Sequence, residues 1–193
     1  MSQVLPTLPA GRVLEVVRAP AEVLATPGER VDAADPAVVQ LCADLVATMY
    51  VSPGCVGLAA QQVGVAAQAF CVDVGEHPKT RTCHGLIVLV NAELVGASKN
   101  EKGREGCMSV PDLTGDVKRA NRVTVRGQLP VTGETVEIVT DAFEARALQH
   151  ELDHCNGLVF LDRVAGAHAL HARKVYLDAP AQDAGSSEAP AAG

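Results

Sequence analysis

The order of apolar and polar positions first predicts an α-helix in the N-terminal third of the chain. Asp35 and Pro36 are a favoured helix start, since an acidic N-cap is followed by proline at the first helical position. The apolar residues that follow recur every three or four positions, which gives the segment one apolar face. A Pro-Gly pair at positions 53 and 54 ends it. The pattern therefore predicts a helix over residues 36–50.

Four short runs with a β-type pattern come next, each bounded by Gly, Pro, Asn or Asp. They occupy residues 69–74, 86–91, 123–127 and 135–140. Pro130 and Gly133 suit a hairpin turn between the last two runs. Because no helix-length crossover separates the runs, mostly antiparallel pairing is expected.

A second helix is predicted over residues 142–155. Asp141 and Glu144 have the spacing of a capping box at its start, and the Asn-Gly pair at 156–157 suits its end. A weaker pattern predicts a third helix over residues 163–177.

Together these elements predict an α+β fold. Mostly antiparallel strands pack around the central helix of residues 142–155, with one helix on the N-terminal side and one on the C-terminal side. The chain of 193 residues is long enough for one domain with a substantial core, assigned to residues 1–177. The Ala-, Pro-, Gly- and Ser-rich residues 178–193 are predicted to form a disordered tail.

Composition narrows the classes of function. The 16 basic and 23 acidic residues give a net charge of −7, which argues against a large nucleic-acid or acidic-membrane surface. No run is apolar enough over its length to span a bilayer, and the N-terminus lacks the pattern of a secretory leader. We therefore expect a cytoplasmic, reduced protein, in which the six cysteines serve for packing, metal binding or catalysis rather than as disulfides.

The segment QHELDHC at residues 149–155 contains the spacing H-E-x-x-H. On a helix, His150 and His154 share a face and can bind one ion, while Glu151 projects about 100° from His150 and can reach a water on that ion. Asp153 lies on the far side and is expected at the surface or in a hydrogen bond. The spacing also arises by chance on a polar helix face, so it does not prove a metal site.

A catalytic metal needs a third protein ligand. The extended metalloprotease pattern would place a histidine at position 160, where the chain has Phe160. Cys107, in the segment EGCMS, is the upstream candidate and would complete a Cys-His-His set with one open position. Taken by itself, a lone cysteine is more often a small buried apolar residue than a ligand.

Three segments together resemble the peptide deformylase family. The family's motifs are G-x-G-x-A-A-x-Q, E-G-C-x-S and Q-H-E-x-D-H, and this chain has CVGLAAQQ at 55–62, EGCMS at 105–109 and QHELDH at 149–154. The three occur in the family's order and at similar separations, and the resemblance covers roughly residues 12–165. Three ordered motifs are far more specific than any one of them.

The resemblance implies a metal-dependent hydrolase that removes the formyl group from N-formylmethionyl chains as they leave the ribosome. It implies Cys107, His150 and His154 as ligands of one divalent metal, usually Fe²⁺ in the cell, with Zn²⁺, Ni²⁺ or Co²⁺ also known in the family. A water or hydroxide on the metal would attack the formyl carbon, with Glu151 as general acid/base. Gln62 and the backbone N–H of Met108 would stabilise the developing oxyanion.

A pocket for the methionine side chain is expected beside these groups. Phe143 and Ala147 share the helix face of His150, and Arg146 either contacts substrate or orients a carboxylate such as Glu105. The other candidate substrate-binding residues are Val56, Gly57 and Leu58. In this reading Gly57 lets the substrate backbone lie close, and Val56 and Leu58 line the opposite wall.

Cys55 is the main departure from the family pattern, because it stands where the motif has its first glycine. If that position required positive φ, cysteine would be strained there. The adjacent Gln61 and Gln62 also make the motif register worth testing, and the spacing favours Gln62.

Two other functions remain open at this point. An H-E-x-x-H metallopeptidase would need a third ligand after His154. A catalytically silent binding protein would hold a closed four-ligand metal site, with Cys155 as the nearby fourth candidate. As a deformylase, the protein is expected to act on nascent formylated peptides, with a transient contact to the ribosome.

Overall fold

The computed structural model describes residues 7–173 of the chain. A sheet of six strands holds the order β1-β2-β3-β4-β5, with β6 paired to β4 beside this path, and every pairing is antiparallel. The strands are β1 (Gly57–Ala59), β2 (Ala69–Val72), β3 (Ile87–Cys107), β4 (Val110–Gln128), β5 (Thr135–Asp141) and β6 (Leu170–Ala172). The predicted α+β class and its antiparallel strands are thus confirmed.

The two predicted major helices are also present, as α1 (Pro36–Val51) and α2 (Ala142–Cys155). The side chain of Asp35 caps α1 by accepting from the N–H of Ala37 at 2.8 Å. Short 3₁₀ turns complete the structure: η1 (Glu22–Ala25), η2 (Ala60–Val63), η3 (Phe160–Arg163) and η4 (Ala167–Ala169). No helix of the described chain has the length and apolarity to cross a membrane.

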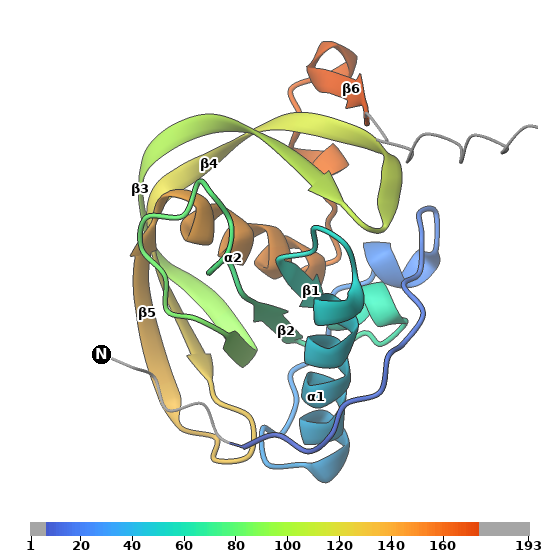
Figure 1. Ribbon diagram of the computed structural model, residues 1–193, viewed down its shortest axis with the longest axis vertical. Helices are drawn as coiled ribbons and strands as arrows, with labels where there is room; N and C mark the ends of the chain where they lie inside the picture. The colour runs from blue at the N-terminus through green and yellow to red at the C-terminus, as the bar shows by residue number, and fades with distance from the viewer. Residues whose placement is uncertain (1–6, 174–193) are drawn as a thin grey trace, which may run out of the picture.

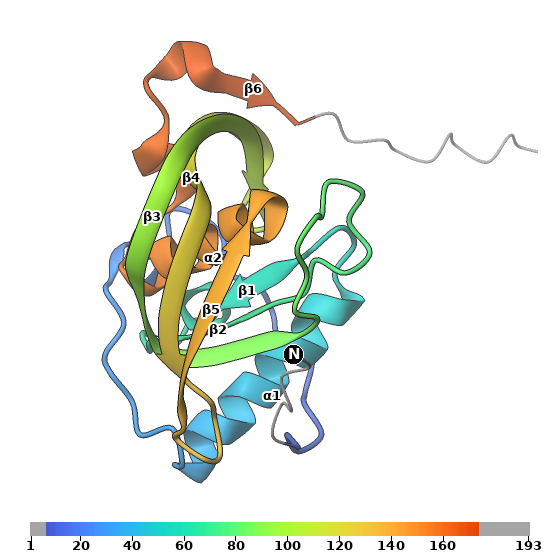
Figure 2. The ribbon, with the colours of Figure 1, turned by 90° about the vertical axis from the view of Figure 1, so that its left-hand side faces the viewer.

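The central part of the sheet is buried on both faces, which explains its unbroken apolar runs. Phe70 of β2 and Leu89 of β3 pack with α2, whereas their neighbours Cys71 and Val88 pack with α1. Figure 1 shows α2 lying beneath the bent ribbon of β3 and β4, and Figure 2 shows the curved strands around it. The sheet therefore holds α2 in a fixed position at the centre of the molecule.

β3 and β4 form a hairpin much longer than the predicted runs, and its two-residue turn is Met108-Ser109. The pairing extends from Val90 and Gln128 to Cys107 and Val110, with register shifts at Val90, Leu94 and Gly106. Irregularities of this kind bend a ribbon and increase its twist. The bend carries the hairpin over α2 and brings its turn back toward the helix (Figure 1).

The predicted third helix is wrong over residues 163–173. This segment contains η4 and then β6, whose Leu170–Ala172 pair with residues 113–115 of β4. Gly166, at φ 151°, adopts a conformation that a helix does not contain, so the helical pattern is interrupted there. Residues 174–177 of that prediction and the predicted tail at 178–193 lie outside the described residues.

The predicted capping box of α2 is also wrong. Asp141 precedes the helix but accepts no capping hydrogen bond. Glu144 is instead fully buried and accepts from the hydroxyl of Thr140 at 2.6 Å, from the N–H of His84 at 2.8 Å, and lies 2.7 Å from the His84 ring. The start of α2 is therefore fixed by tertiary contacts to the 73–86 loop and β5 rather than by a local cap.

The predicted end of α2 at Asn156-Gly157 is confirmed, and Gly157 is required there for two reasons. Its φ is +72°, and a Cβ atom would lie 2.7 Å from the backbone nitrogen of Pro27. Gly157→Ala is expected to lower the free energy of unfolding by about 2–5 kcal/mol, combining about 1–2 for the left-handed backbone with about 1–3 for the clash.

Gly133→Ala is the matched control for urea unfolding, since Gly133 has φ +67° but its Cβ would meet only Ala33 at 3.9 Å. This variant should lose only the backbone contribution, about 1–2 kcal/mol. Equal losses for the two variants would show that the contact with the 25–27 segment is unimportant.

Candidate metal centre and active site

Three predicted ligands from distant parts of the chain converge at the turn of the β3–β4 hairpin. Cys107 ends β3, and His150 and His154 lie one turn apart on α2. One donor atom from each lies within 4.8 Å of the other two, and the thiol sulfur of Cys107 is 3.3 Å from Nε2 of His154. A thiolate and two imidazoles are a donor set suited to zinc or iron, so these residues fit a metal ion chemically.

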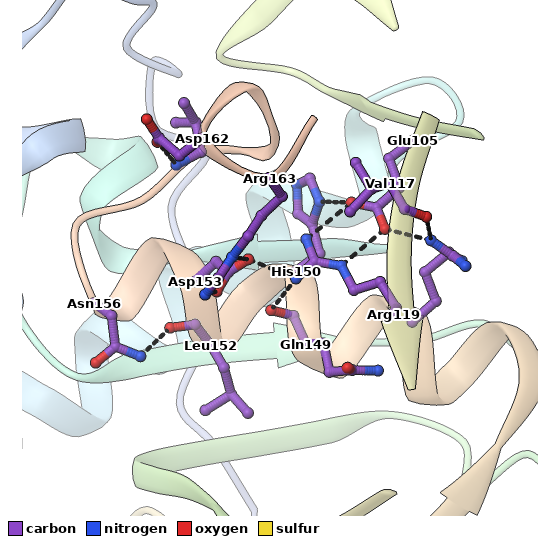
Figure 3. A network of polar contacts seen from close by, with 12 residues as sticks. Glu105, Val117, Arg119, Gln149, His150, Leu152, Asp153, Asn156, Asp162 and Arg163 are labelled. Atoms are coloured by element: carbon purple, nitrogen blue, oxygen red, sulfur yellow. Dashed lines mark hydrogen bonds and ion pairs between the residues drawn. The ribbon is translucent and has the colours of Figure 1, made fainter. Parts of the chain in front are cut away.

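Glu105 holds the His150 ring from behind. Its Oε2 lies 3.1 Å from Nδ1 of His150, so the ring can present Nε2 to a metal. Glu105 also accepts two hydrogen bonds from Arg119, at 2.8 and 2.9 Å (Figure 3). It accepts another from Arg146 at 2.7 Å. Burial opposes ionisation of Glu105, but His150 and Arg119 outweigh it and hold its pKa well below the usual value.

The same ion network continues along α2 to Asp153. Arg119 bridges Glu105 and Asp153, and Arg163 from η3 binds the outer side of Asp153 (Figure 3). Asp153 was expected at the surface or in a hydrogen bond, and it is buried and hydrogen-bonded. Sequence reasoning missed Arg119, because a single arginine in a strand carries no signal of the helix opposite it.

Gln149, the first residue of the QHELDH motif, joins α2 to β4. Its side-chain oxygen accepts from the N–H of Ala120 at 3.0 Å, and its nitrogen donates to the carbonyl of Ala120 at 2.8 Å. This pair reproduces the hydrogen bonding of a neighbouring strand. These two hydrogen bonds fix the position of α2 along β4, and therefore the position of His150 relative to Cys107.

The two candidate ligand histidines differ in their surroundings. Burial and the neighbouring His150 lower the pKa of His154 well below its usual value, which favours the neutral ring that a metal requires. Burial opposes the charge of His150, but Cys107 and Glu105 raise its pKa well above the usual value. Because metal ligands bind deprotonated, loading of this site should release a proton from His150.

Glu151 is buried between the sheet and the cavity, 3% exposed, and its Oε2 has no hydrogen-bond partner within the described residues. Burial raises its pKa to about 7. An unpartnered carboxylate oxygen beside three metal-type donors is what a site completed by an ion and its water would leave, which supports the fit to a metal.

Gly57 leaves room for another residue of the site, a role that the sequence did not suggest. A Cβ atom on it would lie 2.5 Å from Oε1 of Glu151 and 2.9 Å from its carboxyl carbon. The glycine therefore makes room for the Glu151 carboxylate, whereas the sequence suggested room for a substrate backbone.

Gln62 is the glutamine that reaches the centre, as the motif spacing predicted. Its Nε2 lies 3.4 Å from the sulfur of Cys107 and 3.3 Å from the hydroxyl of Ser109, and its oxygen accepts from the N–H of Ala59 at 3.0 Å. Gln61 instead donates weakly to the carbonyl of Cys155 at 3.5 Å. Ser109 is fully buried here and was not anticipated.

Met108 is the first residue of the hairpin turn, directly after Cys107, and its side chain is half-buried. It packs against the core cluster that surrounds α1.

A cavity of about 340 Å³ opens beside His150 and Glu151. Its wall includes four of the predicted pocket residues: Val56, Phe143, Arg146 and Ala147. Leu58 is not among them, because it is fully buried in the core beside α1. The ring of His77, unanticipated, stacks on Phe143 with centroids 3.7 Å apart and so extends the aromatic wall.

Cys55 is accommodated without backbone strain. The described residues with positive φ include Gly54, at +68°, but not Cys55. The thiol donates to the carbonyl of Gly57 at 3.1 Å, and burial raises its pKa to about 12, so it remains protonated at neutral pH. The residue with positive φ is therefore Gly54, one position before the first glycine of the family motif.

The fold and this donor set define an α+β protein with a candidate Cys-His-His metal site between a helix and a hairpin turn. The sequence model of the family described as "Polypeptide deformylase" matches residues 13–169. The chain therefore belongs to the polypeptide deformylase family.

Individual relatives agree in both sequence and structure. A peptide deformylase of Carboxydothermus hydrogenoformans is 45% identical over 128 residues, covering 66% of this chain and 78% of the relative. Peptide deformylase 1 of Bacillus anthracis is 41% identical over 152 residues, covering 79% and 92%. The crystal structure of an Acinetobacter baumannii class I type b peptide deformylase, bound to Met-Ala-Ser, superposes with a TM-score of 0.72 at 35% identity, covering 79% of this chain and 99% of that one.

Removal of the Glu105 charge should weaken metal binding without touching a ligand. In Glu105→Gln, His150 loses its carboxylate partner, and such changes typically reduce metal affinity about 10- to 100-fold. Competition between the folded protein and a chromophoric chelator for Zn²⁺ measures this change. Glu101→Gln is the control, since its exposed carboxylate accepts from Asn121 at 2.6 Å away from the ligands. An unchanged affinity in Glu105→Gln would contradict the proposed orienting role.

Proposed function

We propose that this protein removes the N-formyl group from the N-terminal formylmethionine of newly synthesised polypeptides. The observation that carries the proposal is the convergence of Cys107, His150 and His154 beside the unpartnered carboxylate of Glu151. The family membership supports a deformylase. The Met-Ala-Ser bound to the Acinetobacter relative is the product expected from formyl-Met-Ala-Ser.

Cys107, His150 and His154 would hold one divalent metal ion, Fe²⁺ in the cell, with Zn²⁺, Ni²⁺ or Co²⁺ as alternatives in purified protein. Such an ion supplies Lewis acidity, which makes water a competent nucleophile near neutral pH. The three donors leave room for a ligand that is not protein, as a catalytic site requires.

Glu151 acts as the general acid/base in this proposal. It accepts a proton from the attacking water and returns it to the amine that leaves. A carboxylate with a pKa of about 7 can do both near neutral pH, because neither protonation state is strongly favoured. Burial, the cause of that pKa, also keeps bulk water away from the carboxylate.

Gln62 and the backbone N–H of Met108 would meet the charge that develops on the formyl oxygen. The side-chain nitrogen of Gln62 is held by Cys107 and Ser109 beside the ligand sulfur, and Met108 follows that ligand in the chain. Loss of one such donor typically costs about 10²–10³ in kcat.

The cavity wall formed by Val56, Phe143 and Ala147 would take the methionine side chain. β1 lies at the edge of the sheet, and its backbone at Gly57, which is partly exposed, can pair with an extended peptide. Arg146 would stay on Glu105 as an orienting group, which is the alternative that its 2.7 Å hydrogen bond favours.

The two competing functions lack a supporting contact. Phe160 occupies the position of the metallopeptidase ligand and is buried in a small apolar cluster. Cys155 points its sulfur toward the carbonyl of Ala69 at 3.8 Å and is outside the ligand cluster, so a closed four-ligand site is not formed by the described residues.

In the cell we infer a single catalytic domain, residues 1–177, that works in the cytoplasm on nascent peptides. Its contact with the ribosome would be transient, without stable binding to nucleic acid or membrane, in line with the net charge of −7.

Glu151→Ala tests the mechanism. Anaerobically purified protein should keep its metal, measured by elemental analysis, while formate release from formyl-Met-Ala-Ser falls about 10²–10⁴-fold because proton transfer is lost. Glu137→Ala, at an exposed position of β5, is the control and should be unaffected. Turnover of Glu151→Ala at the wild-type rate would refute the assigned role, and cleavage of internal peptide bonds by the wild type would favour a metallopeptidase.

Gly57→Ala tests whether the position of the Glu151 carboxylate matters for catalysis. The added methyl group must displace the carboxylate of Glu151, so we expect at least a tenfold loss of kcat with metal content unchanged. Gly96→Ala in β3 is the control, since its Cβ would meet mainly the movable side chain of Thr124 at 3.3 Å. Wild-type kcat in Gly57→Ala would show that the position of Glu151 is not critical.

A further inference from the structure

A second hollow adjoins the cavity beside the metal ligands. It has a volume of about 460 Å³ and lies between the 73–86 loop, β3 and the start of α2. The two hollows share four wall residues: Lys79, Arg104, Phe143 and Arg146. A peptide that enters the first hollow with its N-terminus therefore has a continuous surface for the residues that follow.

This surface is cationic although the whole chain has a net charge of −7. Six basic residues line it: Lys79, Arg81, Lys102, Arg104, Arg146 and Arg173. Three of these are ion-paired. Arg146 binds Glu105, and Lys102 and Arg104 share Asp116, which lies outside both walls.

The other three cations, Lys79, Arg81 and Arg173, have no acidic side chain at ion-pair distance among residues 7–173. Of the acidic groups in the two walls, Glu105 is bound to arginines and Glu151 is buried. Glu101 keeps its negative charge, because its partner Asn121 is neutral, and it is one carboxylate against the three unpaired cations. A surplus of positive charge therefore faces a peptide that occupies the two hollows.

Arg173 is held in a defined place. It follows β6, and its guanidinium donates to the carbonyl of Cys107 at 3.2 Å. The guanidinium lies against Gly106, where any Cβ would collide with it. β6 therefore brings a fixed cation to the backbone next to a metal ligand.

Lys79 and Arg81 belong to a loop that is anchored at several points. The Thr80 hydroxyl donates to the carbonyl of Val74 at 2.7 Å, and the Thr82 hydroxyl donates to Asp141 at 2.8 Å. His84 binds the buried Glu144. These bonds hold the loop backbone over the start of α2, so the two cations stay at the wall.

We propose that Lys79, Arg81 and Arg173 are specificity-determining residues that favour formylated peptides with an acidic side chain at the first or second position after methionine. The proposal rests on the proposed function and adds a preference to it. An exposed ion pair typically changes an equilibrium by about 1.4- to 5-fold. Two or three cations acting together should therefore raise kcat/KM about three- to tenfold.

The test compares isosteric substrates that differ only in charge. The metal-loaded wild type is assayed with formyl-Met-Glu-Ser-amide against formyl-Met-Gln-Ser-amide, and with formyl-Met-Ala-Glu-amide against formyl-Met-Ala-Gln-amide. The amide end removes the terminal carboxylate. At least one Glu/Gln ratio of kcat/KM should be about three or more, and it should approach one in 1 M NaCl, where charges are screened over about 3 Å.

Charge reversal assigns the effect to the named residues. Lys79→Glu, Arg81→Glu and Arg173→Glu should each lower that ratio at least twofold, and the ratio is internal to each variant, so a general loss of activity cancels. Arg30→Glu, an equal change of charge outside both walls, should leave the ratio unchanged.

The outcomes separate the two proposals. No deformylation of any substrate by the metal-loaded wild type would refute the proposed function and this inference with it. Deformylation with both ratios near one would refute the inference alone. A preference for acidic peptides that persists in all three variants, or that Arg30→Glu removes equally, would also overturn it, because the charge would then act from elsewhere.

Discussion

The carboxylate of Glu105 is the interaction on which the site depends. It joins β3 to β4 through Arg119 and both strands to α2 through Arg146 and His150. The candidate metal ligands lie on two elements that are far apart in the sequence, and nothing in the hairpin alone would place Cys107 near a helix. The bent ribbon brings the turn close, and the Glu105 cluster sets its final position relative to His150.

Such a buried cluster is a costly way to hold two elements together. Desolvation of several charges offsets much of their attraction, so an apolar contact would stabilise the fold as well or better. An apolar contact would not orient an imidazole, however, because it is not directional. The arrangement is better explained by the geometry it imposes on His150 than by stability, and the chain of charges from Glu105 to Asp153 extends that order along α2.

Local signals made α1, α2 and the pairing of His150 with His154 on one helix face predictable. The Asp35 cap acts within one turn, the end of α2 at Gly157 is set by its own backbone, and the i, i+4 histidines follow from helix geometry. The failures were non-local. β6 forms by pairing with β4. Glu144 binds His84 instead of capping α2. The role of Arg119 depends on its ion pair with Asp153 of α2. In each case a tertiary contact outweighed the local pattern.

Glycines mark where functional side chains approach the strands. Gly57 leaves room for the carboxylate of Glu151. Gly103 leaves room for the guanidinium of Arg146, which lies 2.8 Å from the position that a Cβ atom of residue 103 would take. Gly106 leaves room for the guanidinium of Arg173. Glycine within a strand normally weakens it, so three such positions beside large polar side chains need a reason. The reason is space, since each large polar group lies against a backbone that has no side chain to exclude it. The glycines of β1 and β3 therefore lie where the site needs space for a large polar side chain. Their role can be recognised only when the residues that face them are known.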